Sequence, residues 1–217
     1  MKKFEFTGET KTLFDGTVLH RIKAIVRIES DAGNVEVGDI GGWIEKEDNL
    51  SHDGNAWVYG DAEIYGNARV FDDAWVYGDA EVYGNARVFD DARVYGNARV
   101  YGNAWVYGDA EIYGNAWVYG NARVYGNARV FDDARVFRTE HYLVMGPIES
   151  RNAFTTFFRT KDRKIKVTCG CFFGTIDEFL AKVKRTHGDS KHAKIYRTAV
   201  EIALTQLEDV ERRNDNA

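Results

Sequence analysis

A six-residue repeat dominates the sequence and restricts what the chain can fold into. Fourteen consecutive copies of the form [Gly/Asp]-[Asn/Asp]-Ala-x-[Val/Ile]-[Tyr/Phe] run from Gly54 to Phe137 without a break. A glycine or aspartate at the start of every copy excludes long α-helices, because both residues have poor helix propensity. Alanine, a variable residue x and valine alternate as in a strand, with alanine and valine on one side. The repeat therefore predicts a β-helix.

A second period, of eighteen residues, sets the expected geometry. Residues 54–71 and 72–89 are identical at fifteen of their eighteen positions. Eighteen residues are three repeats, so each coil should hold three short strands and the rod should be a triangular prism. At a strand spacing of about 4.8 Å the rod would be roughly 22 Å long. The alanines and β-branched residues are expected inside, and the Gly-Asn and Gly-Asp pairs at the corners.

The entrance to the repeats, "GGWIEKEDNLSHDGNAWVYG" from Gly41 to Gly60, adds a more specific signal. An aliphatic and a small residue recurring every six positions resemble the hexapeptide-repeat superfamily of left-handed parallel β-helices, whose best-known members are acyltransferases. The Gly-Gly-Trp, Asn-Leu-Ser and Trp-Val-Tyr runs resemble its YdcK-like group of bacterial and phage proteins. The resemblance implies a left-handed coil, and acyl transfer from acetyl-CoA as one candidate activity.

The enzymes of that superfamily typically form trimers and use a histidine as general base. The fourteen repeats contain no histidine, and the nearest ones are His52 before them and His141 after them. These two residues are the candidates for a catalytic base. Uniform repeats without an extruded loop leave no pocket for an acyl donor. The sequence therefore favours a non-enzymatic protein and keeps acyl transfer as the alternative.

The variable residues form three outward faces when positions eighteen apart are stacked. The tryptophan face holds Trp57, Trp75, Arg93, Glu111 and Arg129, the glutamate face Glu63, Glu81, Arg99, Trp117 and Arg135, and the arginine face Arg69, Arg87, Trp105 and Arg123. Exposed tryptophan beside arginine is typical of binding surfaces. The candidate binding residues of the rod are Trp57, Trp75, Trp105, Trp117, Arg69, Arg87 and Arg93.

The ordinary interpretation of the same ladders is simple stabilisation of the rod. Tyrosine and phenylalanine follow each Val or Ile, and stacked aromatic rings stabilise one another. One corner is an asparagine ladder whose side-chain amides are expected to bond along the rod: Asn67, Asn85, Asn103 and Asn121. With seven basic and twelve acidic residues over 54–137, the rod as a whole disfavours a polyanion.

The chain on either side of the repeats differs in pattern. Residues 1–53 predict an N-terminal antiparallel β cap and entry turn, with Trp43 over the end of the prism. Residues 138–217 predict a C-terminal α+β module of strands followed by two helices. A capping box of Thr175 and Glu178 should open the first helix, which Gly188 should end. The second helix is expected over residues 190–211, where apolar residues recur at helical spacing.

Two cysteines and two histidines in the C-terminal module raise the question of a metal site. Cys169 and Cys171 are expected on one strand with both thiols to one side, and His187 and His192 follow at H-x4-H spacing. Cysteine and histidine are zinc ligands, so the four are candidate metal ligands. The alternative is a pair of half-buried core cysteines, and no metal or other cofactor is assigned.

Basic residues also gather in this module. Residues 138–217 hold fifteen basic and eleven acidic residues, against an excess of acid in the rest of the chain. The candidate anion-binding residues are Lys164, Lys166, Lys184, Arg185, Lys191 and Lys194. They are either a solvated surface or a contact for nucleic acid or a nucleotide.

The sequence thus favours a scaffold or binding protein that contacts a protein partner or itself. The alternatives are the acetyl-CoA-dependent transferase and a counter-defence or regulatory protein of a phage or mobile element that binds nucleic acid or nucleotide. The N-terminus lacks the apolar stretch of a secretion signal, and two cysteines suit a reducing compartment. We therefore expect a cytoplasmic protein without a membrane partner.

Overall fold

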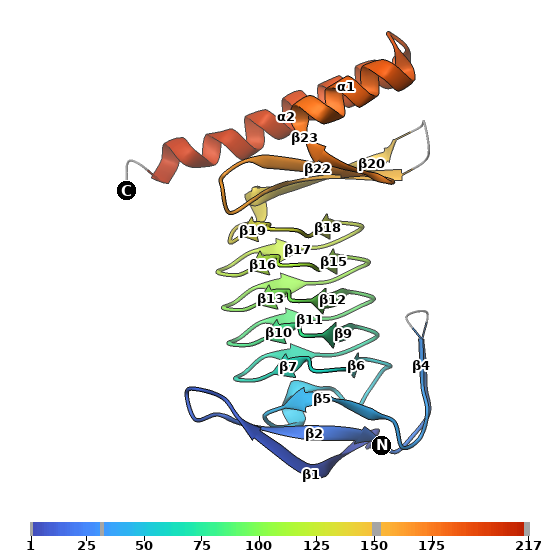
Figure 1. Cartoon of the computed structure of the whole chain (residues 1–217), viewed down its shortest axis with the longest axis vertical. Helices are drawn as coiled ribbons and strands as arrows, with labels where there is room; N and C mark the ends of the chain where they lie inside the picture. Colours follow the sequence, from blue (N-terminus) through green and yellow to red (C-terminus); the bar gives the residue numbers. More distant parts are fainter. Residues whose placement is uncertain (1, 31–32, 149–152, 215–217) are drawn as a thin grey trace.

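The repeats form a straight rod that separates two caps of different architecture (Figure 1). The computed structural model describes residues 2–30, 33–148 and 153–214. Fourteen short parallel strands, β6 to β19, build the rod in three sheets of five, four and five strands. Within each sheet, a strand pairs with the strand eighteen residues further on. In this register Glu81, for example, lies opposite Arg99. The predicted parallel β-helix is confirmed, and its left-handed sense stays a prediction of the resemblance.

The three sheets correspond to the three faces. The glutamate face consists of β7 (Glu63–Ile64), β10 (Glu81–Val82), β13 (Arg99–Val100), β16 (Trp117–Val118) and β19 (Arg135–Val136). The arginine face consists of β8 (Arg69–Val70), β11 (Arg87–Val88), β14 (Trp105–Val106) and β17 (Arg123–Val124). The tryptophan face consists of β6 (Trp57–Val58), β9 (Trp75–Gly78), β12 (Arg93–Gly96), β15 (Glu111–Ile112) and β18 (Arg129–Val130).

The interior of the rod contains the residues that the repeat assigns to it. Every alanine and every valine or isoleucine of the repeats, from Ala56 to Val136, has 0% exposed surface. The corners turn through left-handed backbone, which glycine adopts at little cost. Asp72, Asp90 and Asp132 replace glycine at three corners with φ between 54° and 59°. Aspartate tolerates this conformation better than most side chains, so the repeat continues through these sites.

An antiparallel sheet closes the N-terminal end of the rod. It consists of β1 (Phe4–Thr12), β2 (Val18–Ala24) and β5 (Ile40–Ile44), and β5 adds to the glutamate face through β7. The N–H groups of Trp43 in β5 and of Glu45 directly after it donate to the carbonyls of Ala62 and Ile64 in the first coil. After β5 comes the short helix η1 (Glu47–Asn49), whose Asn49 side chain donates to the carbonyl of Ala68 at 2.8 Å.

Trp43 does not cover the end of the prism, so this prediction is wrong. Trp43 pairs with Glu63 in register and therefore lies in the outward row, while the next residue, Ile44, pairs with Ile64 and points inside. The amino group of Lys11 and the guanidinium of Arg21 lie 4.5 and 4.8 Å from the Trp43 ring centroid. The strand period thus places Trp43 on an outer face beneath the N-terminal sheet.

A second N-terminal hairpin runs beside the rod. It consists of β3 (Ile28–Ser30) and β4 (Gly33–Val35), and Figure 1 shows β4 beside β6. An added Cβ at Gly33 would lie 3.3 Å from the ring of Trp75. The hairpin therefore packs on the tryptophan face.

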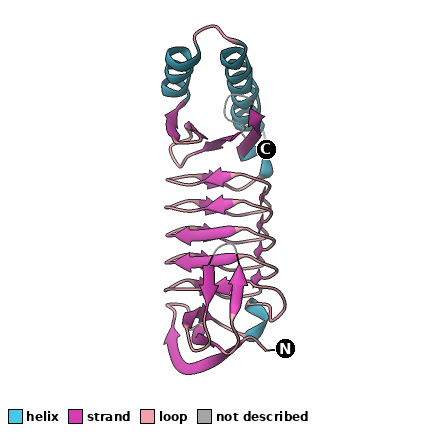
Figure 2. Cartoon of the chain, turned by 90° about the vertical axis from the view of Figure 1, so that its right-hand side faces the viewer, coloured by secondary structure: helices cyan, strands magenta, loops and turns pink. Residues whose placement is uncertain are grey.

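The C-terminal module is a four-stranded antiparallel sheet with two helices on its outer side (Figure 2). Its elements are η2 (Thr139–His141), β20 (Tyr142–Ile148), β21 (Ala153–Arg159), β22 (Ile165–Cys169), β23 (Phe172–Thr175), α1 (Ile176–His187) and α2 (Lys191–Asn214). The predicted capping box is confirmed, since the Glu178 N–H donates to Thr175 Oγ1 and the Thr175 N–H donates to Glu178 Oε2. Helix α2 begins at Lys191 and extends beyond the predicted end. Neither helix offers a described stretch long and apolar enough to cross a bilayer.

Hydroxyl groups of the C-terminal module close the last coil. In the inner coils the strand N–H groups donate to carbonyls of the next coil, as Trp105 does to Ala122. In the last coil the N–H groups of Arg123, Tyr125 and Arg129 donate instead to the hydroxyls of Thr139, Tyr142 and Thr156, at 3.1 to 3.2 Å. These bonds satisfy strand donors that would otherwise be free to pair with another chain.

Candidate binding surfaces

The tryptophan face is largely covered. Trp57 has 0% and Trp75 has 9% exposed surface, because the N-terminal strands pack over both rings. The expectation that these two tryptophans are exposed binding residues is therefore wrong. Further along this face, Arg93 is half-buried between Trp75 and Glu111 in register, and Arg129 forms an ion pair with Glu111 at 3.2 Å.

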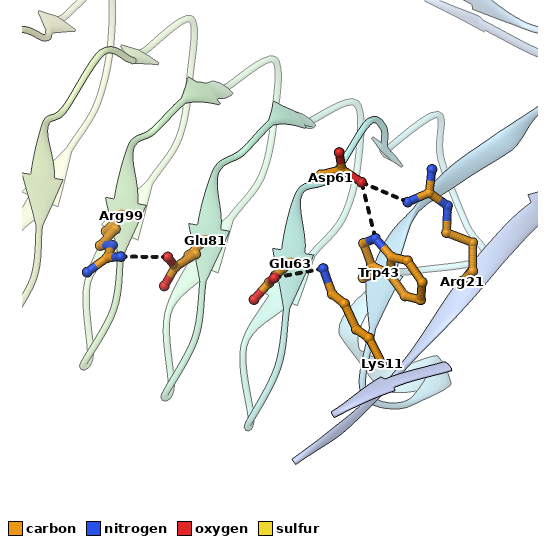
Figure 3. Close-up of polar contacts among 7 residues, drawn as sticks. All are labelled: Lys11, Arg21, Trp43, Asp61, Glu63, Glu81 and Arg99. Carbon is orange, nitrogen blue, oxygen red and sulfur yellow. Dashed lines mark hydrogen bonds and ion pairs between the residues drawn. The ribbon is translucent and has the colours of Figure 1, made fainter. Parts of the chain in front are cut away.

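The glutamate face is a row of paired charges (Figure 3). Lys11 from β1 forms an ion pair with Glu63 at 2.7 Å, and Glu81 pairs with Arg99 at 2.8 Å. Nearby, Asp61 accepts from Arg21 at 3.1 Å and from the Trp43 indole at 3.5 Å. Each carboxylate drawn in Figure 3 therefore has a basic partner one coil or one strand away.

Trp117 continues the glutamate face toward the C-terminal module. The guanidinium carbons of Arg99 and Arg135 lie 5.4 and 4.3 Å from its ring centroid, on neighbouring strands. Contacts of this kind stabilise exposed sites by about 0.5–1 kcal/mol. Trp117 is thus half-buried by its own neighbours rather than presented freely.

The arginine face differs in that its charges are unpaired. Arg69, Arg87 and Arg123 are exposed, and among the described residues none forms an ion pair with a carboxylate. Arg87 and Arg123 lie 5.1 and 4.8 Å from the ring centroid of the half-buried Trp105. The structure therefore brings three of the predicted binding residues, Arg69, Arg87 and Trp105, together on this face.

The corner ladders are confirmed. Tyrosine and phenylalanine rings one coil apart stack nearly parallel, for example Tyr77 and Tyr95 at 4.7 Å. Burial raises the pKa of tyrosines within these stacks, among them Tyr83 and Tyr113. The asparagine ladder is a chain of side-chain hydrogen bonds, from Asn67 to Asn85, Asn103 and Asn121 at 3.1 to 3.2 Å.

The two candidate histidines lie at opposite ends of the rod. His52 stacks on Phe4 with ring centroids 4.3 Å apart, and its Nδ1 accepts the Lys3 N–H. His141 is 2% exposed and packs edge-on against Phe137. Burial, with the positive charge of Arg159 second, lowers the pKa of His141 to about 4. Both rings are therefore held in structural contacts.

The cysteines do not share a strand, contrary to prediction. Cys169 ends β22 and pairs with Phe172 at the start of β23, so Gly170 and Cys171 form a two-residue hairpin turn. Gly170 has φ 58°, which the turn requires. The thiol of Cys169 lies 3.8 Å from the Tyr196 hydroxyl.

The turn borders a small pocket beside α1. The pocket has a volume of about 80 Å³ and is lined by Cys169, Cys171, Phe172, Phe179, Lys182, Val183, Thr186, His187 and Tyr196. The rings of His187 and His192 are 5.8 Å apart. Within the described residues no three His, Cys, Asp or Glu side chains converge as a metal site would require. The predicted zinc ligands thus gather in one region without forming a coordination shell.

The predicted basic residues divide into two groups. One group surrounds the turn that connects α1 and α2 at Gly188. It consists of Lys184 and Arg185 in the last turn of α1, and Lys191 and Lys194 in the first turn of α2. Lys164 follows the β21–β22 turn, which lies on the opposite side of the module in Figure 1. Lys166, from β22, lies 4.9 Å from the Phe173 ring centroid.

Three features of these surfaces were missed by sequence reasoning. The β3–β4 hairpin on the tryptophan face, the ion pairs from β1 and β2, and the hydroxyl caps all join segments that are distant in sequence. A partial signal existed for the charge pairing, since the glutamate and tryptophan faces contain both Glu and Arg, whereas the arginine face contains no Glu.

A parallel solenoid with three short strands per coil defines a class of protein, the β-solenoid repeat proteins. Comparison with known families then identifies the type of repeat. Residues 62–78, 92–108, 116–130 and 122–138 match the family model described as YdcK Beta solenoid repeat. These segments of the rod are thus similar to the YdcK-type solenoid repeat, the group that the sequence resembles.

A relative from Escherichia coli (strain K12) is similar to part of this chain. It is named "Uncharacterized acetyltransferase YdcK" and is 32% identical over 80 residues. The aligned region covers 32% of this chain and 24% of that protein. The similarity therefore spans about a quarter of the relative's length.

Proposed function

We propose that the protein is a non-enzymatic binding scaffold whose C-terminal module presents a basic tip to an anionic partner. The observation that carries this proposal is the group of cations around the turn that connects α1 and α2 at Gly188. Exposed Lys184 and Arg185 precede it, and exposed Lys194 follows it, so cations from two helices project from one end of the module. The Arg197 guanidinium, by contrast, is held by Asp189 at 3.2 Å.

The rod supports this function as a spacer. Its coils contact only their neighbours, and each coil bonds to the next through backbone hydrogen bonds. The N-terminal sheet covers one end, and the hydroxyls of the C-terminal module satisfy the other. Such a rod holds its two caps at a fixed separation. It also keeps the basic tip of the C-terminal module away from the acidic residues of the rod.

The test is binding of a fluorescein-labelled single-stranded oligonucleotide, followed by anisotropy at several salt concentrations. Replacing Lys184, Arg185 and Lys194 with glutamine should weaken binding at least about ten-fold and flatten its salt dependence, because fewer phosphates are neutralised. Lys164→Gln, at the opposite turn, is the control and should have little effect. Poly-glutamate serves as a second anionic probe. The proposal that the basic tip binds an anionic partner is refuted if both variants lose the same affinity, or if the protein binds neither the oligonucleotide nor poly-glutamate.

Acetyl transfer is the second candidate, supported by the name of the Escherichia coli relative. The contacts of His52 with Phe4 and Lys3, and the burial of His141, favour binding over this chemistry. Calorimetric titration with acetyl-CoA, combined with the solution mass, distinguishes the two. A trimer that binds acetyl-CoA would support the transferase.

A further inference from the structure

The arginine face departs from the charge pattern of the rest of the rod. On the other two faces, Arg99 and Arg129 each form an ion pair with a glutamate one coil away, in the pairs Arg99–Glu81 and Arg129–Glu111. On the arginine face, Arg69 and Arg87 are direct partners on adjacent strands. Like charges opposite each other in a sheet are destabilising. Glu63 and Glu81 are also adjacent on the glutamate face, but each has a basic partner, whereas no ion pair of Arg69 or Arg87 is found among the described residues.

Trp105 holds the guanidinium groups of this face in position. Arg87 and Arg123 flank it in register, with guanidinium carbons 5.1 and 4.8 Å from its ring centroid. A guanidinium stacked on a ring still presents its N–H donors at its edges. Stacking also limits the entropy that an arginine loses when it binds a carboxylate.

The asparagine ladder borders this face and adds further donors. Asn67, Asn85 and Asn103 are exposed, and each uses its amide NH₂ to reach the next asparagine. An amide has two N–H groups, so one bond along the ladder leaves a second N–H for a ligand. The Lys46 amino group donates to Asn67 Oδ1 at 3.3 Å and extends the row.

A hollow lies at the N-terminal end of the row. Its volume is about 240 Å³, and it is lined by Lys46, Asp48, Asn67, Ala68 and Arg69. Asp48 is the carboxylate in this lining. Along the row, the four cations Lys46, Arg69, Arg87 and Arg123 outnumber this carboxylate, so the row favours a ligand rich in acceptors and negative charge.

We propose that the arginine face and the asparagine ladder form a docking surface for an extended acidic segment of a partner protein. Arg69 to Arg123 spans three coils, about 14 Å at ~4.8 Å per coil, which is the length of about four extended residues. Carboxylates match the planar guanidinium fork, and backbone carbonyls of the segment match the free amide N–H groups. On the far side of the face, the corner aspartates Asp72, Asp90 and Asp109 repel a continuous polyanion, so a short acidic peptide fits better than nucleic acid.

The experiment uses the full chain and a fluorescein-labelled peptide of alternating glutamate and serine, with anisotropy as the readout. Arg69→Gln and Arg87→Gln should each weaken binding by about three- to ten-fold, as expected for charged hydrogen bonds at a partly exposed site. Arg129→Gln, on the tryptophan face and paired with Glu111, is the matched control and should leave the affinity unchanged. A peptide of glutamine and serine should not bind.

Thermal unfolding separates this role from a structural one. Arg69→Gln should leave the unfolding midpoint unchanged or raise it, because it removes one of two adjacent like charges and keeps the contact of Arg87 with Trp105. The proposal is overturned if the acidic peptide does not bind, if Arg129→Gln weakens it equally, or if an oligonucleotide binds this face better than the peptide. Glutamine variants at Lys184 and Arg185 should leave peptide binding intact, so failure of the basic tip and of this surface are distinguishable.

Discussion

The rod and the C-terminal module bury their apolar side chains in different ways. In the repeats every interior position is alanine, valine or isoleucine, stacked in layers of nearly the same composition. In the module the core is assembled from Phe157, Phe179, Tyr196 and Leu207, which come from a strand and two helices. The rod therefore depends on local repetition, whereas the module depends on the fit of dissimilar side chains.

This difference determines how each part should respond to change. A layer of the rod has little freedom to rearrange, because its short alanine and β-branched side chains pack against similar layers above and below. The module contains longer, flexible side chains, including Leu143, Met145 and Leu204, packed around its core. Such side chains accommodate a volume change more readily than alanine and valine do.

The largest expected effect comes from adding volume to both cores. Ala98→Leu should lower the free energy of unfolding of the rod by at least about 3 kcal/mol. Ala203→Leu in α2 should lower that of the module by about 1–2 kcal/mol, because only the module is able to repack. Both alanines have 0% exposed surface, which makes the pair a matched comparison. All five tryptophans lie between Trp43 and Trp117, so their fluorescence during urea unfolding reports on the rod. Circular dichroism of the helices reports on the module. Equal costs would show that the two cores do not differ in this way.

The same contrast explains how much could be predicted from sequence. The period of eighteen predicts the burial of Ala98 and the outward position of Arg87, because each coil copies its neighbour. It does not predict that Trp57 and Trp75 are covered, since their cover comes from β5 and from the β3–β4 hairpin, which lie outside the repeat. In the module, Thr175 and Glu178 predict the start of α1 from local chemistry. The Cys169 turn was misplaced because a two-residue turn within an apolar run resembles a continuous strand.

The junction between the rod and the module should respond to pH. The pKa of His141 is lowered to about 4 in the folded state, against about 6.5 when unfolded. A base with a lowered folded pKa is protonated first in the unfolded state, so stability falls as pH drops from about 6.5 toward 4. The loss between pH 7 and 4.5 should be about 2 kcal/mol.

His141→Gln isolates this contribution, because it removes the titrating ring and leaves the carboxylates that also titrate over this range. The measurement is urea unfolding of both proteins at pH 7 and pH 4.5. The variant should lose less stability on acidification than the original chain. A parallel loss in the two proteins would mean that His141 does not become charged on unfolding.

A glycine-to-alanine change should destabilise the protein more in the interior of the rod than in its last coil. Gly102 and Gly126 both have positive φ, of 72° and 63°, so alanine is strained at either site. An added Cβ at Gly102 would lie 3.0 Å from the backbone nitrogen of Gly120, whereas at Gly126 it would meet nothing within 4 Å. Gly102→Ala should therefore cost about 1–2 kcal/mol more than Gly126→Ala. Thermal unfolding of the two variants measures the difference, and similar midpoints would show that the coils separate easily.

The smallest effect concerns the corner ladder, which only a repeat can form. Asn103→Ala removes the hydrogen bonds to Asn85 and Asn121 at an exposed corner. Net stabilisation by such bonds is about 0.5–1 kcal/mol in exposed positions, so urea unfolding should detect a loss of that size. Asn97→Ala is the control, because Asn97 lies at an equally exposed corner whose neighbours in the stack are Asp79 and Asn115. If the two variants lose the same amount, the ladder adds nothing to the backbone bonds between coils. If Asn103→Ala alone is destabilised, side-chain repetition stabilises the rod beyond its core.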